Sequence, residues 1–292
     1  MNKNFNKGLI LTSLGSFWWG FIGVIYFEYV SFIGHVELVS HRCIWTAVML
    51  ILTTTFFSKW NSFLLIISDK KILIALFISG FLIFINWSIW IYAVATNRII
   101  DASFGYFIMP IISVLLGYIF FKEKLNMKRI FSIILVLISL VILILFNLKA
   151  LPWVGIIVAL SWAFYNLIRK KIKIDTDIGL LIESLYIFPF AFIAFYFISK
   201  NSLNDFSLDN PGLSIYLLLA GPMTVIPLFL YVRGVELIGL GPTGMIFYIT
   251  PTLQFILGYF YYNEDFSIIK FLSFIIIWIA VIVYLKDLYE KN

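Results

Sequence analysis

The sequence predicts an all-α membrane protein with ten transmembrane helices, arranged as two inverted repeats of five helices each. Three observations lead to this fold class: the composition, ten apolar segments of spanning length, and an internal repeat. Of the 292 residues, 62% are hydrophobic and 12% are charged, whereas soluble domains carry about 45–50% apolar and about 25% charged residues. The surplus of apolar surface indicates that much of the chain faces lipid.

The ten apolar segments follow one another from end to end of the chain. A helix needs about 20 predominantly apolar residues to cross the hydrocarbon core of a bilayer. Segments of about that length cover residues 8–30, 37–57, 72–95, 102–121, 128–147, 153–169, 178–198, 213–232, 242–262 and 268–286. Because the connections between them are too short for a soluble domain, we expect the function to lie within or between the helices.

The positions of the basic residues predict the orientation. If the N-terminus is cytoplasmic, 16 of the 21 Lys and Arg residues lie on the cytoplasmic side, four lie on the opposite side, and Arg42 lies within a span. Cytoplasmic loops of membrane proteins carry an excess of positive charge. We therefore predict that both termini are cytoplasmic.

An internal repeat relates segments four and five to segments nine and ten. At a constant separation of 141 residues, Pro110 aligns with Pro251, Gly117-Tyr118 with Gly258-Tyr259, and Glu123 with Glu264. The repeat divides the chain into residues 1–150 and 151–292, each with five spans. Since five is odd, the second half enters the membrane from the opposite side. Inverted repeats of this kind are typical of secondary transporters, in which they give two access states of similar energy.

Four of the ionisable residues in the predicted spans are functional candidates, because a charge inside the membrane costs roughly 2.5–3.5 kcal/mol on insertion scales. Glu37 and His41 share one face of the second span, and Arg42 is beside them, which predicts a polar cluster near the non-cytoplasmic end. The alternative is that Arg42 extends to the headgroups and pairs with Glu37. Glu183 in the seventh span has no partner in its own helix, so we predict that it binds a coupling proton or the substrate; a structural hydrogen bond to a neighbouring helix is the alternative.

The paired prolines and several mid-span side chains predict a central binding site. Pro110 and Pro251 each remove a helical hydrogen bond, and exposed carbonyls at membrane depth persist only against protein or a cavity. Proline that merely shapes helix packing is the alternative. Candidate lining residues at similar depth are Asn86, Trp87, Tyr106, Trp162, Tyr165 and Tyr248. An aromatic cavity with few charges favours a small amphipathic or cationic solute.

Enzymatic and nucleic-acid functions have little support. The sequence has no HExxH motif, no phosphate-binding glycine loop and no nucleophile elbow, and its two histidines are too few for a metal cluster. Cys43 is the single cysteine, so no intrachain disulfide is expected. We predict no cofactor, no metal and no nucleic-acid partner. The alternative function is a membrane-embedded enzyme acting on a lipid or lipid-linked substrate, which only Glu37, His41 and Arg42 could serve.

A run of motifs resembles a known family. Glu37 to Trp45 is similar to the E-x-x-x-H-R-x-x-W pattern of the RarD family, in the EamA-type branch of the drug/metabolite transporter superfamily. Further similar stretches follow in order: Asn86-Trp87, Ala102 to Ile108 with Pro110, Ala163 to Tyr165, Arg169 to Lys171, Ile182-Glu183, Val225 to Pro227, and Tyr248 to Thr252. This chain departs from the family at Met109 and Phe247, which replace amide side chains close to the two prolines.

The resemblance implies a bacterial cytoplasmic (inner) membrane protein with two inverted five-helix repeats, in a family named for an association with chloramphenicol sensitivity. We predict a secondary active transporter, not an enzyme. It would export a small metabolite or amphipathic drug-like solute by alternating access, with protons as the candidate coupling ion. The predicted partners are a small-molecule substrate and membrane lipid, and Gly117 and Gly258 leave close packing into a homodimer open.

Overall fold

Long helices make up the structure, a computed structural model that describes residues 3–96, 99–147, 153–201, 203–261 and 267–290, without the side chains at 94–95, 99–104 and 147. In the first half the elements are α1 (Lys3–Phe17), the π-helical turn η1 (Trp18–Ile22), α2 (Gly23–Tyr29), α3 (His35–Phe56), α4 (Trp60–Ile67), α5 (Lys70–Ala95), α6 (Ile99–Phe121) and α7 (Met127–Asn147). In the second half they are α8 (Trp153–Lys171), α9 (Thr176–Lys200), α10 (Pro211–Leu218), α11 (Ala220–Ile238), α12 (Leu240–Ile246), α13 (Ile249–Phe260) and α14 (Ile268–Glu290). The described residues include no strand.

The helices fall on the apolar segments of the sequence. By length and composition, seven helical segments of the described chain can cross a membrane: 3–29, 35–56, 70–93, 127–146, 176–200, 211–238 and 268–290, while 105–121 is a shorter apolar helix. Two further predicted spans correspond to α8 and to the broken pair α12–α13. The short helix α4, which connects α3 and α5, was not predicted. The chain is thus an all-helical protein with several apolar spans.

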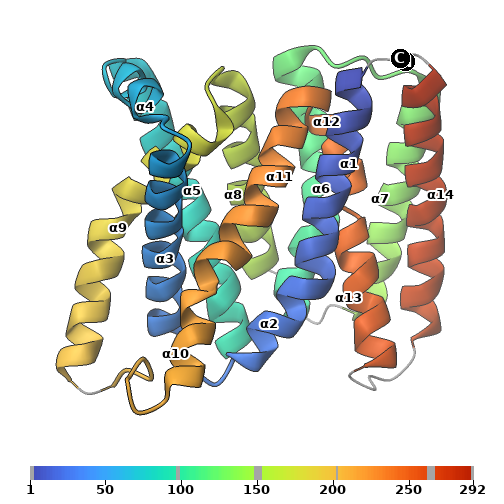
Figure 1. Ribbon diagram of the computed structural model, residues 1–292. Coiled ribbons are helices and arrows are strands. Elements are labelled where there is room, and N and C mark those ends of the chain that lie inside the picture. Colours follow the sequence, from blue (N-terminus) through green and yellow to red (C-terminus); the bar gives the residue numbers. More distant parts are fainter. Residues whose placement is uncertain (1–2, 97–98, 148–152, 202, 262–266, 291–292) are drawn as a thin grey trace.

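Both ends of the chain lie at the same end of the bundle (Figure 1). We call this the terminal end, since α1 begins there and α14 finishes there, and we call the other the opposite end. The long helices run alternately between the two. Large apolar side chains such as Phe56 and Phe260 point outward and are 82% and 76% exposed, whereas polar side chains such as Glu183 are buried. This distribution suits a lipid surround.

The most extensive helix contacts join the two halves of the chain. They pair α1 with α11, α6 with α8, α3 with α9, α7 with α14 and α5 with α8. Several contacts between the halves bring backbones together at glycines, and two of them are the tightest. A Cβ at Gly105 would overlap the carbonyl of Gly155, and one at Gly221 would lie 2.5 Å from the carbonyl oxygen of Trp45. Helices α6 and α8, and helices α3 and α11, therefore approach at backbone distance.

The two repeat-related prolines have different local geometries. Helix α6 passes through Pro110 without interruption, whereas Phe247 and Tyr248 separate α12 from α13 and Pro251 is the third residue of α13. Proline is tolerated in a first turn, where its missing N–H has no helical partner. The Phe247 carbonyl accepts a hydrogen bond from the N–H of Thr250 at 2.9 Å. The break before Pro251 therefore exposes no free carbonyl at Phe247.

Candidate functional site

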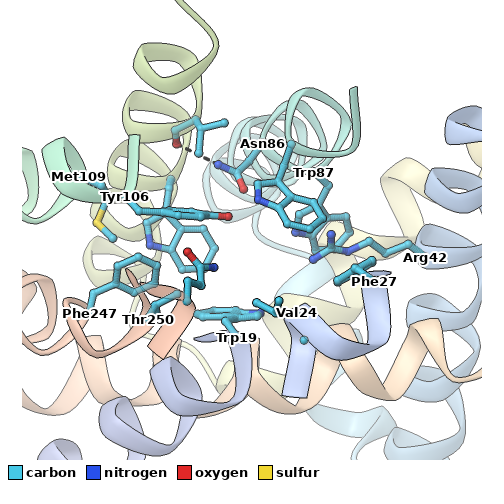
Figure 2. A pocket seen from close by; sticks show the side chains of 15 residues that line it. Trp19, Val24, Phe27, Arg42, Asn86, Trp87, Tyr106, Met109, Phe247 and Thr250 are labelled. Atoms are coloured by element: carbon cyan, nitrogen blue, oxygen red, sulfur yellow. Dashed lines mark hydrogen bonds between the residues drawn. The ribbon is translucent and has the colours of Figure 1, made fainter. Parts of the chain in front are cut away.

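A cavity lies between the halves (Figure 2). Its lining residues on α2, α3 and α5 belong to the parts of these helices nearer the opposite end. Its described lining comprises Trp19, Gly23, Val24, Phe27, Arg42, Asn86, Trp87, Trp90, Tyr106, Met109, Val158, Trp162, Phe247, Thr250 and Gln254. The volume is about 60 Å³, which at about 30 Å³ per water is room for about two water molecules. Most of the lining side chains are aromatic or apolar and few are polar, and both halves of the chain contribute to the lining.

Four packed rings close the cavity on the side of the terminal end, and we call them the aromatic floor: Trp19, Trp162, Tyr231 and Phe247. The ring centroids of Trp19 and Trp162 are 5.1 Å apart, those of Trp162 and Tyr231 are 5.4 Å apart, and those of Tyr231 and Phe247 are 5.6 Å apart. The Tyr231 hydroxyl donates to the Thr243 carbonyl at 3.2 Å. These rings come from η1, α8, α11 and the α12–α13 break, so the floor joins four elements.

Arg42 is the cationic group of the cavity wall. Its guanidinium lies over the ring of Trp87, with Cζ 4.6 Å from the centroid, and 5.0 Å from that of Phe27. Its Nε donates to Thr224 Oγ1 at 3.0 Å. The side chain is only 6% exposed. Figure 2 shows it reaching from α3 between these rings toward the cavity.

Five of the predicted site residues meet at this cavity: Arg42, Asn86, Trp87, Tyr106 and Trp162. The Asn86 amide nitrogen donates to the Val158 carbonyl at 2.9 Å and to Ser161 Oγ at 3.1 Å, which ties α5 to α8 and leaves the amide oxygen toward the cavity. The ring of Tyr106 packs at 5.7 Å from that of Phe247.

The predicted lining residue Tyr248 lies elsewhere: it is buried and donates to the Phe107 carbonyl at 2.8 Å. Pro110 and Pro251 flank the lining residues Met109 and Thr250.

Glu183 and Tyr165 belong to a second polar site, separate from the cavity. The Glu183 carboxylate accepts hydrogen bonds from Ser79 Oγ at 2.5 Å and from the Tyr165 hydroxyl at 3.2 Å, and its Oε1 lies 3.6 Å from Arg169 Nη1. Glu183 is 2% exposed and Arg169 is 1% exposed, so this is a buried ion pair. Gly179, one turn before Glu183, leaves space for the Arg169 side chain, because a Cβ at this position would overlap the guanidinium.

Arg169 is the functional residue that sequence reasoning missed. Its position near the end of a span placed it among the cytoplasmic charges that set topology. In the structure its Nη2 donates to the Thr176 carbonyl at 3.0 Å, and its side chain turns inward toward α9. A signal was present, since Tyr165 and Arg169 are four residues apart and share a helical face. Glu183 therefore has a cation as its partner.

Glu37 and His41 form a third site, at the opposite end. The Glu37 carboxylate accepts hydrogen bonds from the N–H of Asp205 at 2.9 Å and of Phe206 at 3.0 Å. His41 Nε2 lies 3.5 Å from Glu37, and His41 Nδ1 accepts from the Trp45 indole at 3.0 Å, which assigns the ring proton to Nε2. Partial burial and the charge of Glu37 raise the pKa of the Asp205 carboxyl in the loop.

The predicted cluster of Glu37, His41 and Arg42 is thus divided in the structure. Glu37 and His41 face the loop of residues 203–210, while Arg42, one residue farther around α3, faces α11 and the cavity. Glu37 does not pair with Arg42, because backbone N–H groups already satisfy its carboxylate. The three side chains therefore do not share one site.

Substituting Glu37 by alanine is expected to loosen the loop of residues 203–210. Hydrogen bonds to a charged group contribute about 1.5–3 kcal/mol, so deuterium exchange at the Asp205 and Phe206 amides should accelerate about 10- to 100-fold. Hydrogen–deuterium exchange mass spectrometry measures this. Asp209→Asn, at an exposed position of the same loop, is the control and should exchange as the wild type does. Equal protection in Glu37→Ala and wild type would contradict the anchoring role.

Glu123 lies at the terminal end and binds the start of α12. Its carboxylate accepts hydrogen bonds from the N–H of Leu240 and of Gly241, each at 2.9 Å, in the first turn of α12. Negative charge at a helix N-terminus is stabilising. Gly117 makes space for this carboxylate, because a Cβ there would lie 2.6 Å from it. Its repeat counterpart Glu264 lies outside the described residues.

Metal chemistry finds no support among the residues that the structure covers. They contain no group of three or more His, Cys, Asp or Glu side chains that could hold an ion. Cys43 is buried in the core with a free thiol. The described cavity wall offers one guanidinium, amides and aromatic faces.

Comparison with known proteins gives consistent relatives. The EamA-like transporter family matches residues 6–145 and again residues 150–286. An "Uncharacterized transporter" of Vibrio cholerae is 32% identical, over 96% of this chain and 92% of that protein. "Protein RarD" of Escherichia coli is 30% identical, over 98% and 96% respectively. A crystal structure that shares 11% sequence identity superposes with a TM-score of 0.72 over 96% of this chain and 97% of the other, which shows a common fold.

Proposed function

This chain belongs to the EamA-like transporter family, and from that premise we propose that it is a secondary active transporter that exports a small organic solute by alternating access through the cavity. The observation that carries the proposal is the cavity itself, which both halves line and which the aromatic floor closes on one side. Movement of one half against the other would open the floor and close the opposite end. The Vibrio cholerae relative is named a transporter, in keeping with a function that is not enzymatic.

The transport cycle that we propose uses ten spans in two inverted halves, residues 1–150 and 151–292. The helix contacts support this symmetry. If α1, α3 and α5 correspond to α8, α9 and α11, each of the following contacts has a counterpart: α1 packs on α11 as α8 packs on α5, and α3 packs on α11 as α9 packs on α5. Helices α3 and α9, and helices α7 and α14, are counterparts that pack on each other. Such symmetry gives two packings of similar energy, one open to each side.

Contacts between repeat-related residues add to this support. Tyr248 donates its hydroxyl hydrogen bond to the carbonyl of Phe107, and the ring of Phe247 packs on that of Tyr106. Each pair is separated by the 141 residues that relate the two halves in sequence. Residues next to the local axis of an inverted repeat meet their own counterparts in this way. The axis would then pass beside the cavity.

The orientation that we propose places the terminal end in the cytoplasm of a bacterial cell, because 16 of the 21 Lys and Arg residues belong to that side. The cavity then lies in the non-cytoplasmic half of the bundle, and the aromatic floor separates it from the cytoplasmic side. An exporter in this arrangement has just released its substrate outward. Its volume of about 60 Å³ admits only a small solute in this state.

Glu183 is the carboxylate that we propose for proton coupling. Its negative charge balances the charge of Arg169, so protonation would leave a buried guanidinium without a counter-ion and would favour a rearrangement. Both Arg169 and the floor residue Trp162 belong to α8, separated by two turns. A change at the ion pair can thus be transmitted to the floor along one helix. Protonation and access would be coupled by that route.

Uptake of small molecules by proteoliposomes tests the proposal. The purified chain is reconstituted with an outward or inward pH gradient, incubated with a bacterial metabolite extract, and the accumulated solutes are identified by mass spectrometry. We expect at least one solute to accumulate according to the direction of the gradient. Glu183→Gln should lose gradient-driven accumulation and retain solute exchange, because the amide cannot carry the charge that a proton neutralises.

Two outcomes would count against the proposal. Accumulation no greater than in protein-free liposomes, for a correctly folded sample under both gradients, would remove the transport function. Gradient-driven accumulation by Glu183→Gln at the wild-type rate would remove the carboxylate from the coupling step. Lys128→Met, which alters an exposed cation at the terminal end, serves as the control and should transport as the wild type does.

A further inference from the structure

We propose that the solute bound in the cavity is a small aromatic monocarboxylate, whose carboxylate is held by the unused N–H groups of Arg42. The inference rests on the proposed transport function and names its substrate class. A guanidinium offers five N–H donors in a planar fork. Among the described residues, Arg42 donates one hydrogen bond, from Nε to Thr224. Its two terminal nitrogens therefore have four N–H donors left for a ligand.

Burial makes these free donors significant. Arg42 is only 6% exposed. A buried cation is costly unless it is paired with an anion and hydrogen-bonded. No described carboxylate faces it; Glu37, one turn away on the same helix, is bound to the backbone of the loop. The rings of Phe27 and Trp87 offset part of the cost through cation–π contact. A carboxylate would supply the remaining partner and can accept two parallel N–H bonds.

The charge of the wall selects the sign and number of charges on the solute. Arg42 is the one Lys, Arg, Asp or Glu among the described lining residues, so the wall carries a single positive charge. A monoanion matches it, whereas a phosphate dianion would need a second cation and an ammonium would be repelled. This reverses the expectation from the sequence, which favoured an amphipathic or cationic solute on the strength of the aromatic residues alone.

The remaining surface selects a flat apolar group. Trp19, Trp90, Tyr106 and Phe247 present rings to the same cavity, and aromatic pairs favour offset-stacked or edge-to-face contact. The amide oxygen of Asn86 and the amide of Gln254 add a few polar contacts at the wall. The cavity volume of about 60 Å³ is below the roughly 150 Å³ of a cavity that binds benzene, so the solute is limited to a single ring and the wall must widen to take it.

Arg42 is also held in place before any solute arrives. Gly221 brings α11 to backbone contact with α3 at Trp45, which sets Thr224 beside Arg42. The Thr224 hydroxyl in turn donates to the Ala220 carbonyl at 2.8 Å, so its oxygen is oriented to accept from Nε. A guanidinium fixed at Nε and stacked on two rings loses little freedom on binding, which favours affinity.

Benzoate, benzyl alcohol and benzylamine are the probes that test the inference, because they share one ring and carry charges of −1, 0 and +1 at neutral pH. Calorimetric titration of the purified full-length protein should show benzoate binding about 10- to 100-fold more tightly than benzyl alcohol, with benzylamine weakest. Arg42→Met should abolish the preference for the acid, and Arg42→Lys should retain part of it, because lysine keeps the charge and loses the fork. Lys128→Met is the control for loss of a cation far from the cavity and should keep the full preference.

The wild-type ranking alone decides the matter if Arg42→Met does not fold. Equal binding of benzoate and benzyl alcohol, or tighter binding of benzylamine, would overturn the carboxylate inference. So would a preference for benzoate that persists in a folded Arg42→Met, or the failure of all three probes to bind at millimolar concentration. None of these results touches the proposed transport function, which the metabolite uptake assay tests without assuming a substrate class.

Discussion

Replacing Arg169 by methionine is expected to lower the free energy of unfolding by about 3–5 kcal/mol, which is the usual cost of removing one partner of a buried ion pair. The change leaves the carboxylate of Glu183 buried at 2% exposure, with only the hydroxyls of Ser79 and Tyr165 to stabilise its charge. Glu183→Gln should have a cost of the same kind, because it leaves the guanidinium without its anion. Chemical unfolding of the purified protein in mixed micelles measures both.

The double variant Arg169→Met with Glu183→Gln separates pairing from packing. Since it buries no unpaired charge, we expect it to recover most of the stability that either single variant loses. Arg233→Met is the matched control, because Arg233 pairs with Glu236 at 2.7 Å at the same end of the bundle but is 41% exposed. That change should cost about 1 kcal/mol or less. An Arg169 variant no less stable than the Arg233 variant would show that the buried pair contributes nothing.

Trp162→Ala is expected to cost about 3–5 kcal/mol of stability and to abolish gradient-driven transport. Trp162 is 6% exposed and contacts the rings of Trp19, Tyr231 and Phe247, so its loss removes the centre of the aromatic floor. The cavity would then extend toward the terminal end, and solute could pass without alternation of access. Unfolding in micelles and solute retention by proteoliposomes measure the two effects.

Two companion variants make the Trp162 result specific. Phe164→Ala removes a ring from the same helix, but Phe164 is 40% exposed and lies outside the floor, so transport should persist. Trp162→Phe restores a ring and should recover part of both properties. Retained gradient-driven accumulation in Trp162→Ala would show that the floor does not close the cavity.

The positions of the helices were predictable from the sequence, because spanning a membrane requires runs of apolar residues of a set length. The family was also predictable: the motifs from Glu37 to Thr252 indicated the EamA-type branch, and the family match confirms it. The short helix α4 escaped notice because it lies in a connection, where apolar length is not demanded. The break at Phe247 and Tyr248 was predicted only as a proline kink, since the sequence does not show at which residue a helix is interrupted.

The candidate site was predictable in part. Five predicted residues line the cavity, because polar groups at mid-span depth are costly to expose to lipid and therefore face the protein interior: Arg42, Asn86, Trp87, Tyr106 and Trp162. The partner of Glu37 was beyond sequence reasoning, since backbone N–H groups of a distant loop leave no mark on residue identity. The sign of the solute charge could be inferred only from the structure, because it depends on which carboxylates already have hydrogen-bond or ion-pair partners.

The contacts between the halves have a consequence for how the chain is made. The most extensive contacts of α1, α3, α5, α6 and α7 are all with helices that are synthesised later. While the ribosome is still on the first half, those faces are without partners, and lipid or a chaperone must cover them. We expect residues 1–150 expressed alone to be degraded and to survive when residues 151–292 are expressed alongside. Maturation of this protein is thus an assembly step between two inserted fragments that share one chain.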